Sequence, residues 1–126
     1  INIECLKTLR ITSYPGTFSQ ILTNLIMNSL THGFNSSKHK AVIKIEVTEG
    51  YNKLFLNYSD NGKGISKANL HKIFDPFYTT NRENGGTGLG LNIVYNLITS
   101  KLNGKIECKS KLKEGTKFIM NFELDS

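Results

Sequence analysis

The stretch "NRENGGTGLGLNIVYNLI" (residues 81–98) places four glycines at positions 85, 86, 88 and 90, directly before an amphipathic pattern. Apolar residues then recur at helical spacing up to Leu102, so we predict a helix that begins near Gly90 and ends at Asn103 and Gly104. Glycines let backbone N–H groups point inward, and the start of a helix adds free N–H groups and the positive end of its dipole. This combination is typical of phosphate binding.

The spacing of these glycines disfavours two common nucleotide folds. It reads G-x-G-x-G over Gly86, Gly88 and Gly90, whereas dinucleotide-binding folds use G-x-G-x-x-G and P-loops use G-x-x-x-x-G-K-[ST]. The run alone is equally consistent with a flexible linker. Its interpretation therefore depends on the segments around it.

The bulk properties predict one globular domain over residues 1–126. The chain has 38% hydrophobic and 21% charged residues, no run of about 18 apolar residues and no signal peptide. We therefore expect a soluble, cytoplasmic domain, which leaves open a membrane anchor in its parent. Because the chain starts at Ile1, we expect it to be a fragment of a longer protein. Cys5 and Cys108 are expected to be reduced core thiols.

The formal charge of +6 raises the question of nucleic-acid binding. Fourteen of the sixteen basic residues are lysines spread along the chain. A solvated sheet face explains their densest set and is preferred, whereas specific nucleic-acid binding would require a steep salt dependence of affinity. The set comprises Lys105, Lys109, Lys111, Lys113 and Lys117.

The periodicities predict an α/β (α+β) two-layer sandwich. We expect a mixed sheet of about five strands, covered on one face by about three helices. Pro15 and Gly16 are predicted to form a turn, with Thr17 or Ser19 capping the helix that follows and Ser66 capping a second helix. The predicted elements are a strand before Pro15, helices over 18–31, 67–74 and 90–102, and two hairpins, 41–47 with 53–59 and 105–110 with 116–124.

The first predicted helix has a polar face without charged side chains. Gln20, Asn24, Asn28, Thr31 and His32 fall on this face at about 100° per residue. A solvent-exposed face normally carries Lys and Glu, so we interpret this one as a pocket wall; a buried polar face bonded to neighbouring elements is the alternative. The amide oxygen of Asn28 suits Mg²⁺, which takes few protein ligands.

A second candidate site is "YSDNGKGI" (residues 58–65), at the end of a predicted strand. Asp60 is followed by Gly62 and Gly64, which places a carboxylate beside backbone that a ligand can approach closely. A buried carboxylate can accept a hydrogen bond from an exocyclic amine such as that of adenine. A plain turn is the alternative interpretation.

Four segments together resemble the ATP-binding catalytic domain of sensor histidine kinases, in the superfamily that includes type II topoisomerase, mismatch-repair and heat-shock chaperone ATPases. "QILTNLIMNSLTHGF" resembles the N box, "DNGKGI" the G1 box, "FDPFYTT" the F box and "GTGLGL" the G2 box. Their order and spacing agree over residues 14–124. The resemblance implies a Bergerat-type ATP-binding fold.

The resemblance implies a role for each matching residue. Asn28 would hold Mg²⁺, Asn24 would support it or touch phosphate, and Asp60 would accept the adenine amine. Gly62 and Gly64 would leave room for the base, and Phe74, Phe77, Thr79 and Thr80 would anchor a phosphate lid. His32 would stack on adenine or be merely a polar residue at the helix end. The implied nucleotide-binding set also includes Ile65, Gly86, Thr87, Gly88, Leu89 and Gly90.

Two positions bear on the reaction. Thr31 stands where the family commonly has Lys, and Arg82 could instead steady the transferring γ-phosphoryl group, although an idle exposed Arg is nearly as plausible. In relatives that hydrolyse ATP, the position of Asn24 is commonly occupied by Glu, which acts as a general base towards water. An amide cannot take that proton, which favours transfer over hydrolysis.

The resemblance therefore implies a histidine kinase of two-component phosphorelay signalling. The chain would bind Mg-ATP and donate the γ-phosphoryl group to a histidine on a separate dimerisation domain of the same protein, which then serves a response regulator. Neither His39 nor His71 lies in a context resembling the acceptor. An ATPase of the same superfamily and a nucleotide-sensing module without transfer activity are the alternatives.

Overall fold

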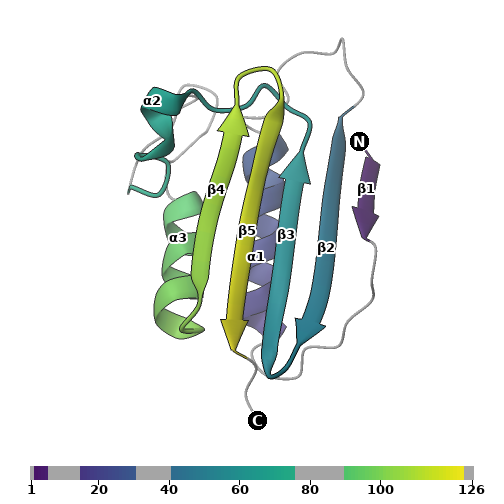
Figure 1. Ribbon diagram of the computed structural model, residues 1–126, viewed down its shortest axis with the longest axis vertical. Helices are drawn as coiled ribbons and strands as arrows, with labels where there is room; N and C mark the ends of the chain where they lie inside the picture. Colours follow the sequence, from purple (N-terminus) through teal and green to yellow (C-terminus); the bar gives the residue numbers. More distant parts are fainter. Residues whose placement is uncertain (1, 6–14, 31–40, 76–89, 124–126) are drawn as a thin grey trace.

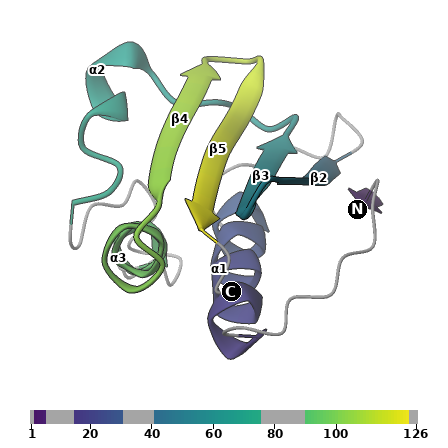
Figure 2. The ribbon, with the colours of Figure 1, turned by 60° about the horizontal axis from the view of Figure 1, so that its bottom comes forward.

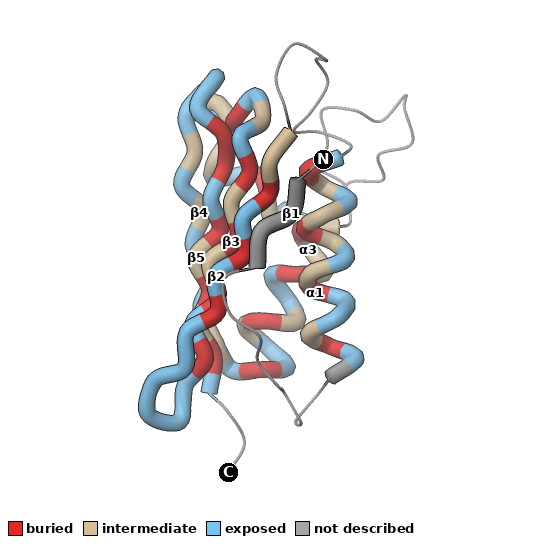
Figure 3. Tube along the Cα trace, turned by 90° about the vertical axis from the view of Figure 1, so that its right-hand side faces the viewer, coloured by how far each residue is buried: buried red, intermediate tan, exposed pale blue. Residues whose placement is uncertain are grey.

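The computed structural model describes residues 2–5, 15–30, 41–75 and 90–123, which form two layers (Figure 1). A sheet forms one layer, and α1 and α3 lie together against one of its faces (Figure 3). Figure 2 shows these two helices side by side beneath the sheet. The elements are β1 (Asn2–Cys5), α1 (Pro15–Asn28), β2 (Val42–Gly50), β3 (Lys53–Asp60), α2 (Lys67–Leu70), α3 (Gly90–Asn96), η3 (Leu97–Lys101), β4 (Lys105–Lys111) and β5 (Gly115–Glu123).

The sheet has five strands in the order β1-β2-β3-β5-β4. β1 pairs with β2 in parallel, and the other three pairs are antiparallel. Both predicted hairpins are present, as β2–β3 and β4–β5. The predicted mixed sheet and α+β sandwich are therefore confirmed.

The core lies between the sheet and its helices. Strand residues alternate between the two faces of the sheet, so every second side chain of β3, of β5 and of β2 as far as Val47 is buried. Full burial of a large apolar side chain contributes roughly 1.5–3 kcal/mol, and this layer supplies most of the hydrophobic stabilisation. Its fully buried members include Ile21, Leu25, Ile43, Leu54, Leu56, Tyr58, Val94, Ile98 and Met120.

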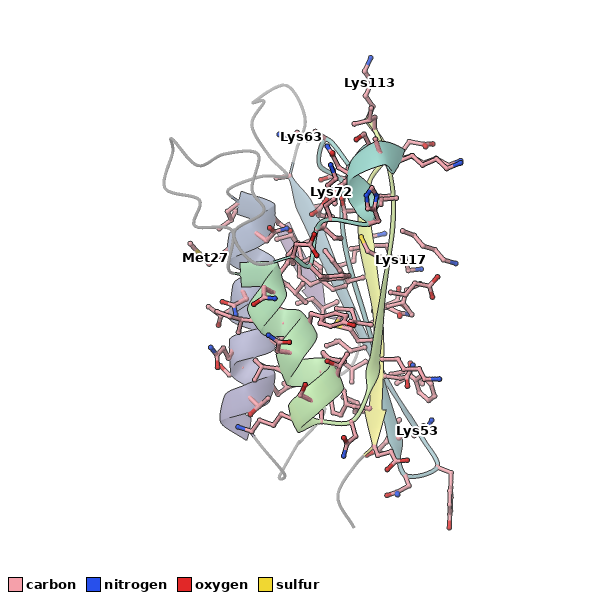
Figure 4. The ribbon with its side chains drawn as sticks, turned by 90° about the vertical axis from the view of Figure 1, so that its left-hand side faces the viewer. Met27, Lys53, Lys63, Lys72, Lys113 and Lys117 are labelled. Atoms are coloured by element: carbon pink, nitrogen blue, oxygen red, sulfur yellow. The ribbon has the colours of Figure 1, made fainter. Side chains whose placement is uncertain are left out.

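The predicted lysine set follows the opposite, uncovered face of the sheet. Along β4, exposed Lys105, Lys109 and Lys111 alternate with half-buried residues, and Lys117 is exposed on β5. Figure 4 shows Lys117 on the side of the sheet away from the helices. The lysines therefore occupy the solvated face that the alternation predicted.

The predicted start of the first helix is wrong. α1 begins at Pro15, so Pro15 and Gly16 belong to the helix, and Thr17 lies buried inside it instead of capping it. Proline is well suited to the first helical turn because that turn has no intrahelical acceptor for its N–H groups. The helical pattern of the later residues did not reveal this.

The second helix is shorter than predicted. α2 ends at Leu70, and Ser66 occupies the cap position without a side-chain cap bond. Beyond it, the chain tightens through bonds from Lys72 N–H to Asn69 O (2.9 Å) and from Asp75 N–H to Lys72 O (3.0 Å). These turns bring Ile73 into the core, where its side chain is 3% exposed.

The segments predicted to carry the site meet at one end of the molecule. Figure 1 shows the C-terminal end of α1, the N-terminal end of α3, the end of β3 and the β4–β5 turn together at the upper end. None of the described helices is long and apolar enough to cross a lipid bilayer.

The β4–β5 turn closes onto the end of β3 through a glycine. Gly115 has φ +96°, and a Cβ there would lie 2.1 Å from the carbonyl oxygen of Asp60. Glycine is therefore required at this position both by its backbone conformation and by the space available.

We predict that Gly115→Ala lowers the free energy of unfolding by about 2 kcal/mol or more, because alanine meets both the strained φ and the clash. Gly16→Ala is the control, since a Cβ there meets nothing within 4 Å. Replacing a helical glycine stabilises by up to about 1 kcal/mol. Urea unfolding of both variants measures the difference, and equal stabilities would contradict the prediction.

Candidate functional site

Asp60 is the last residue of β3 and is only 9% exposed. Its strand lies between two others, so Asp60 pairs with Ile43 on β2 and with Thr116 on β5. Tyr58, two residues earlier, points to the same helix-covered face. The backbone of the central sheet thus fixes where this carboxylate enters the site.

Both carboxylate oxygens of Asp60 accept hydrogen bonds. The Ser29 hydroxyl donates to Oδ2 at 2.8 Å, and the Gly62 backbone N–H donates to Oδ1 at 3.0 Å. A carboxylate offers about four lone-pair sites, and these two bonds use two of them. The arrangement makes Asp60 an oriented acceptor at the sheet end.

Ser29 and Tyr58 extend this contact into the core. Their hydroxyl oxygens are 2.7 Å apart, and the Tyr58 hydroxyl also donates to the carbonyl oxygen of Leu25 at 3.1 Å. Ser29 is 1% exposed and Tyr58 is fully buried. Burial raises the pKa of Tyr58 well above its usual value, so the phenol stays neutral at physiological pH. The network joins α1 to β3 directly behind Asp60.

The loop after Asp60 is held by the β4–β5 turn. The Ile65 N–H donates to Ser110 Oγ at 2.7 Å, and Ser110 Oγ in turn donates to Gly115 O at 2.6 Å. Gly64 has φ +78°, and a Cβ there would lie 2.0 Å from Lys111 O. Packing of backbone against backbone therefore explains the glycine at position 64.

The polar side of α1 includes an amide nitrogen without a partner. Asn24 and Asn28 are half-buried and flank the buried stripe of the helix, whereas Gln20 is exposed. Asn24 Nδ2 is buried, and among the described residues no acceptor lies within hydrogen-bonding reach of it. A buried unsatisfied donor costs about 1–3 kcal/mol, so each one calls for an explanation such as a ligand.

The start of α3 is tied to the segment after α2. Asn92 Nδ2 donates to Phe74 O at 3.0 Å. The Phe74 ring lies 5.2 Å from that of Tyr95 and 6.3 Å from that of Phe118, measured between centroids. The helix begins at Gly90, as predicted. Phe74, the first predicted lid anchor, therefore contacts both the helix and the core.

The structure brings part of the predicted site together. The end of α1, the loop after β3 and the start of α3 share one end of the molecule (Figure 1), and they carry Asn24, Asn28, Asp60, Gly62, Gly64, Ile65 and Gly90. The remaining predicted residues lie outside the described part of the chain: His32, Phe77, Thr79, Thr80, Arg82, Gly86, Thr87, Gly88 and Leu89.

Sequence reasoning missed the residues that support Asp60. Ser29 continues the i, i+4 stripe of Ile21 and Leu25, and a hydroxyl within an apolar stripe signals a buried hydrogen bond. Tyr58 was recognisable as inward-facing because it alternates with Asp60. Neither signal indicates the hydrogen-bond partner, because that partner is distant in sequence.

Comparison with known proteins identifies relatives of this fold and site. Residues 14–126 match the family model described as histidine kinase-, DNA gyrase B- and HSP90-like ATPase. The sensor histidine kinase ZraS of Salmonella typhimurium is 35% identical over 118 residues, which cover 93% of this chain and 23% of ZraS. This chain therefore spans about a quarter of that relative's length.

Two solved structures share the architecture. The catalytic domain of histidine kinase ThkA, in a nucleotide-free form, superposes with a TM-score of 0.74 at 29% identity, covering 97% of this chain and 76% of that one. The mycobacterial sensor histidine kinase MprB gives a TM-score of 0.78 at 18% identity, covering 98% and 81%. The second likeness shows the fold alone.

Cys108 is a free, half-buried cysteine whose thiol is affected by its burial and by the charge of Asp60. Burial, and to a lesser extent the negative charge of Asp60, raises the pKa of this thiol from 9.0 to about 12. As the pH rises above 9, the unfolded thiol loses its proton first, so the unfolded state gains stability relative to the folded state.

We therefore predict that the free energy of unfolding of the wild type falls by about 1.4 kcal/mol more than that of Cys108→Ala between about pH 8 and pH 10. Parallel urea titrations across this range measure the difference. The two proteins share every other titrating group, so parallel pH profiles would contradict the raised thiol pKa.

Proposed function

Because the chain belongs to the family of histidine kinase-, DNA gyrase B- and HSP90-like ATPases, we propose that it binds Mg-ATP and donates the γ-phosphoryl group to a histidine. The acceptor histidine would lie on a separate dimerisation domain of the same protein, and a response regulator would receive the phosphoryl group next. The likeness to sensor histidine kinases such as ZraS supports transfer within this broad family.

The hydrogen bond from Ser29 to Asp60 is the observation that carries the proposal. At 2.8 Å it brings the end of α1, where Asn28 precedes Ser29, next to the carboxylate at the end of β3. The carboxylate proposed to bind the base and the amide-bearing helix therefore lie next to each other. A nucleotide needs this pairing, because its base and its phosphates require different chemistry.

Asp60 would bind the base. One of its remaining lone pairs would accept a hydrogen bond from the exocyclic amine of adenine, and Gly62 N–H holds the carboxylate in place at 3.0 Å. A buried acceptor rejects a base that lacks the matching donor, since its lone pair would lose water without gaining a partner.

The amides of α1 would face the phosphates and the metal. Asn24 Nδ2, a buried donor without an acceptor among the described residues, fits a phosphate oxygen. The side-chain oxygen of half-buried Asn28 would hold Mg²⁺, which neutralises phosphate charge when bound. Arg82 and the glycines at 86 and 88 remain proposed phosphate contacts, and α3 begins at Gly90.

The identity of Asn24 favours phosphoryl transfer over hydrolysis. An amide cannot accept a proton from an attacking water, so this side chain offers no general base. Positioning of an acceptor in line with the γ-phosphoryl group would then decide the reaction, and that acceptor would come from the partner domain.

We predict that Asp60→Asn lowers ATP affinity by at least about 100-fold, because the change keeps the shape of the side chain but replaces an acceptor oxygen with a donor. Isothermal titration calorimetry in Mg²⁺ measures the affinity, and circular dichroism checks the fold. Asp75→Asn, an exposed carboxylate, is the matched control. Unchanged affinity in Asp60→Asn would remove the base assignment.

Transfer is tested by mixing the chain with the separately produced dimerisation domain of its parent protein and γ-labelled ATP. We expect label on histidine, recognised because phosphohistidine is labile to acid, and only slow release of phosphate without the partner. Rapid phosphate release by the chain alone would indicate an ATPase. Nucleotide binding with neither outcome would indicate a sensing module.

A further inference from the structure

Behind Asp60, two buried hydroxyl groups form a chain that reaches it from the core side. Ser29 Oγ donates to Asp60 Oδ2 at 2.8 Å, and Tyr58 OH lies 2.7 Å from Ser29 Oγ. Ser29 is 1% exposed and Tyr58 is fully buried, so water does not compete for these contacts. Tyr58 OH also lies 3.1 Å from the carbonyl oxygen of Leu25, within α1.

The direction of the hydrogen bonds follows from counting protons. Ser29 has one hydroxyl proton, and its donation to Asp60 leaves its oxygen able only to accept. Tyr58 must therefore donate at the 2.7 Å contact, while sharing its proton with Leu25 O at the longer 3.1 Å contact. The hydrogen bonds run from Tyr58 to Ser29 to Asp60, and each strengthens the next.

Hydrogen bonds hold the Asp60 carboxylate at both of its oxygens. Ser29 fixes Oδ2, and the Gly62 N–H fixes Oδ1 at 3.0 Å, so rotation of the group about its Cβ–Cγ bond would break a bond at each oxygen. The lone pairs of the carboxylate that these two donors do not use therefore keep one direction. Removal of the Ser29 hydroxyl would release Oδ2, and removal of the Tyr58 hydroxyl would leave the Ser29 hydroxyl free to turn away from Oδ2.

We propose that Ser29 and Tyr58 are positioning residues that fix the Asp60 carboxylate and thereby set the preference of the site for a base bearing an exocyclic amine over one bearing a carbonyl oxygen. The inference rests on the proposed function, since it requires that Asp60 face the base. It assigns base selectivity to two side chains that themselves contact no nucleotide.

Affinities for ATP and for ITP distinguish this positioning role from a general effect on nucleotide binding. The two nucleotides differ at position 6 of the base, where the amine of ATP is a carbonyl oxygen in ITP, and at the adjacent N1, which is an acceptor in ATP and carries a proton in ITP. A fixed carboxylate accepts from the amine and repels the oxygen, whereas a carboxylate free to turn does neither well. Loss of positioning therefore lowers the affinity for ATP and leaves the affinity for ITP nearly unchanged.

A purely structural network would behave differently. If the hydroxyls only tied α1 to the sheet, their removal would lower the stability of the fold. It would also lower the affinities for both nucleotides to the same degree. The ratio of the two affinities is thus the quantity that distinguishes positioning from support.

The experiment measures ATP and ITP affinities by calorimetry for the wild type, Ser29→Ala, Tyr58→Phe and the double variant. We expect each single variant to lower the affinity for ATP about tenfold, as for loss of a hydrogen bond to a charged group. The affinity for ITP should fall less than about twofold. Because Tyr58 acts through Ser29, Tyr58→Phe should change ATP affinity less than about twofold in the Ser29→Ala background. Ser19→Ala and Tyr51→Phe, both exposed, are the controls.

A second readout needs no nucleotide. The amide proton of Gly62 reports on Asp60 Oδ1, so its NMR chemical shift should move in Ser29→Ala and Tyr58→Phe but not in the controls. Thermal unfolding confirms that each variant is folded at the assay temperature.

The outcomes separate the two proposals. A wild type that prefers ATP, with variants in which this preference and the Gly62 amide shift change together, supports positioning. Equal losses for ATP and ITP, or no loss, would overturn the positioning role and leave the proposed function intact. A wild type that binds neither nucleotide would overturn both.

Discussion

A carboxylate buried at the end of a central strand constrains this structure more than any other group. Asp60 is 9% exposed, and an ionised side chain at such a position is stable only when hydrogen bonds replace the water that it loses. Those bonds come from two directions, the hydroxyl of Ser29, directly after α1, and the backbone N–H of Gly62. The helical layer and the loop after β3 must therefore keep their positions relative to the sheet.

The hairpin β4–β5 packs against the backbone at the end of β3 and against the loop that follows it. Gly115 approaches the Asp60 carbonyl, and Gly64 approaches that of Lys111, at distances that leave no room for a Cβ. Ser110 links the two segments through Ile65 N–H and Gly115 O. The loop that would surround the base is thus shaped by backbone packing as well as by the freedom of its glycines.

These contacts divide the proposed site into a part that would bind the base and a part that would bind the phosphates. The sheet and the hairpin fix one acceptor, while half-buried amides on α1 offer a donor at Asn24 and an oxygen at Asn28. Both groups lie within residues 14–126, which match the histidine kinase-, DNA gyrase B- and HSP90-like ATPase family. The hydroxyl pair behind Asp60 links this carboxylate to α1 and to the core.

The sequence alone determined the fold class, the two hairpins, the start of α3 and the end of β3 at Asp60, because alternating and helical periodicities are local consequences of which face is buried. It misjudged the start of α1 and the end of α2, where a proline in the first turn and the burial of Ile73 decided the boundary. Only the tertiary structure joined Ser29 to Tyr58 and Asp60, which lie 29 and 31 residues away. Periodicity shows that a side chain is buried, but its hydrogen-bond partner is set by how the layers pack.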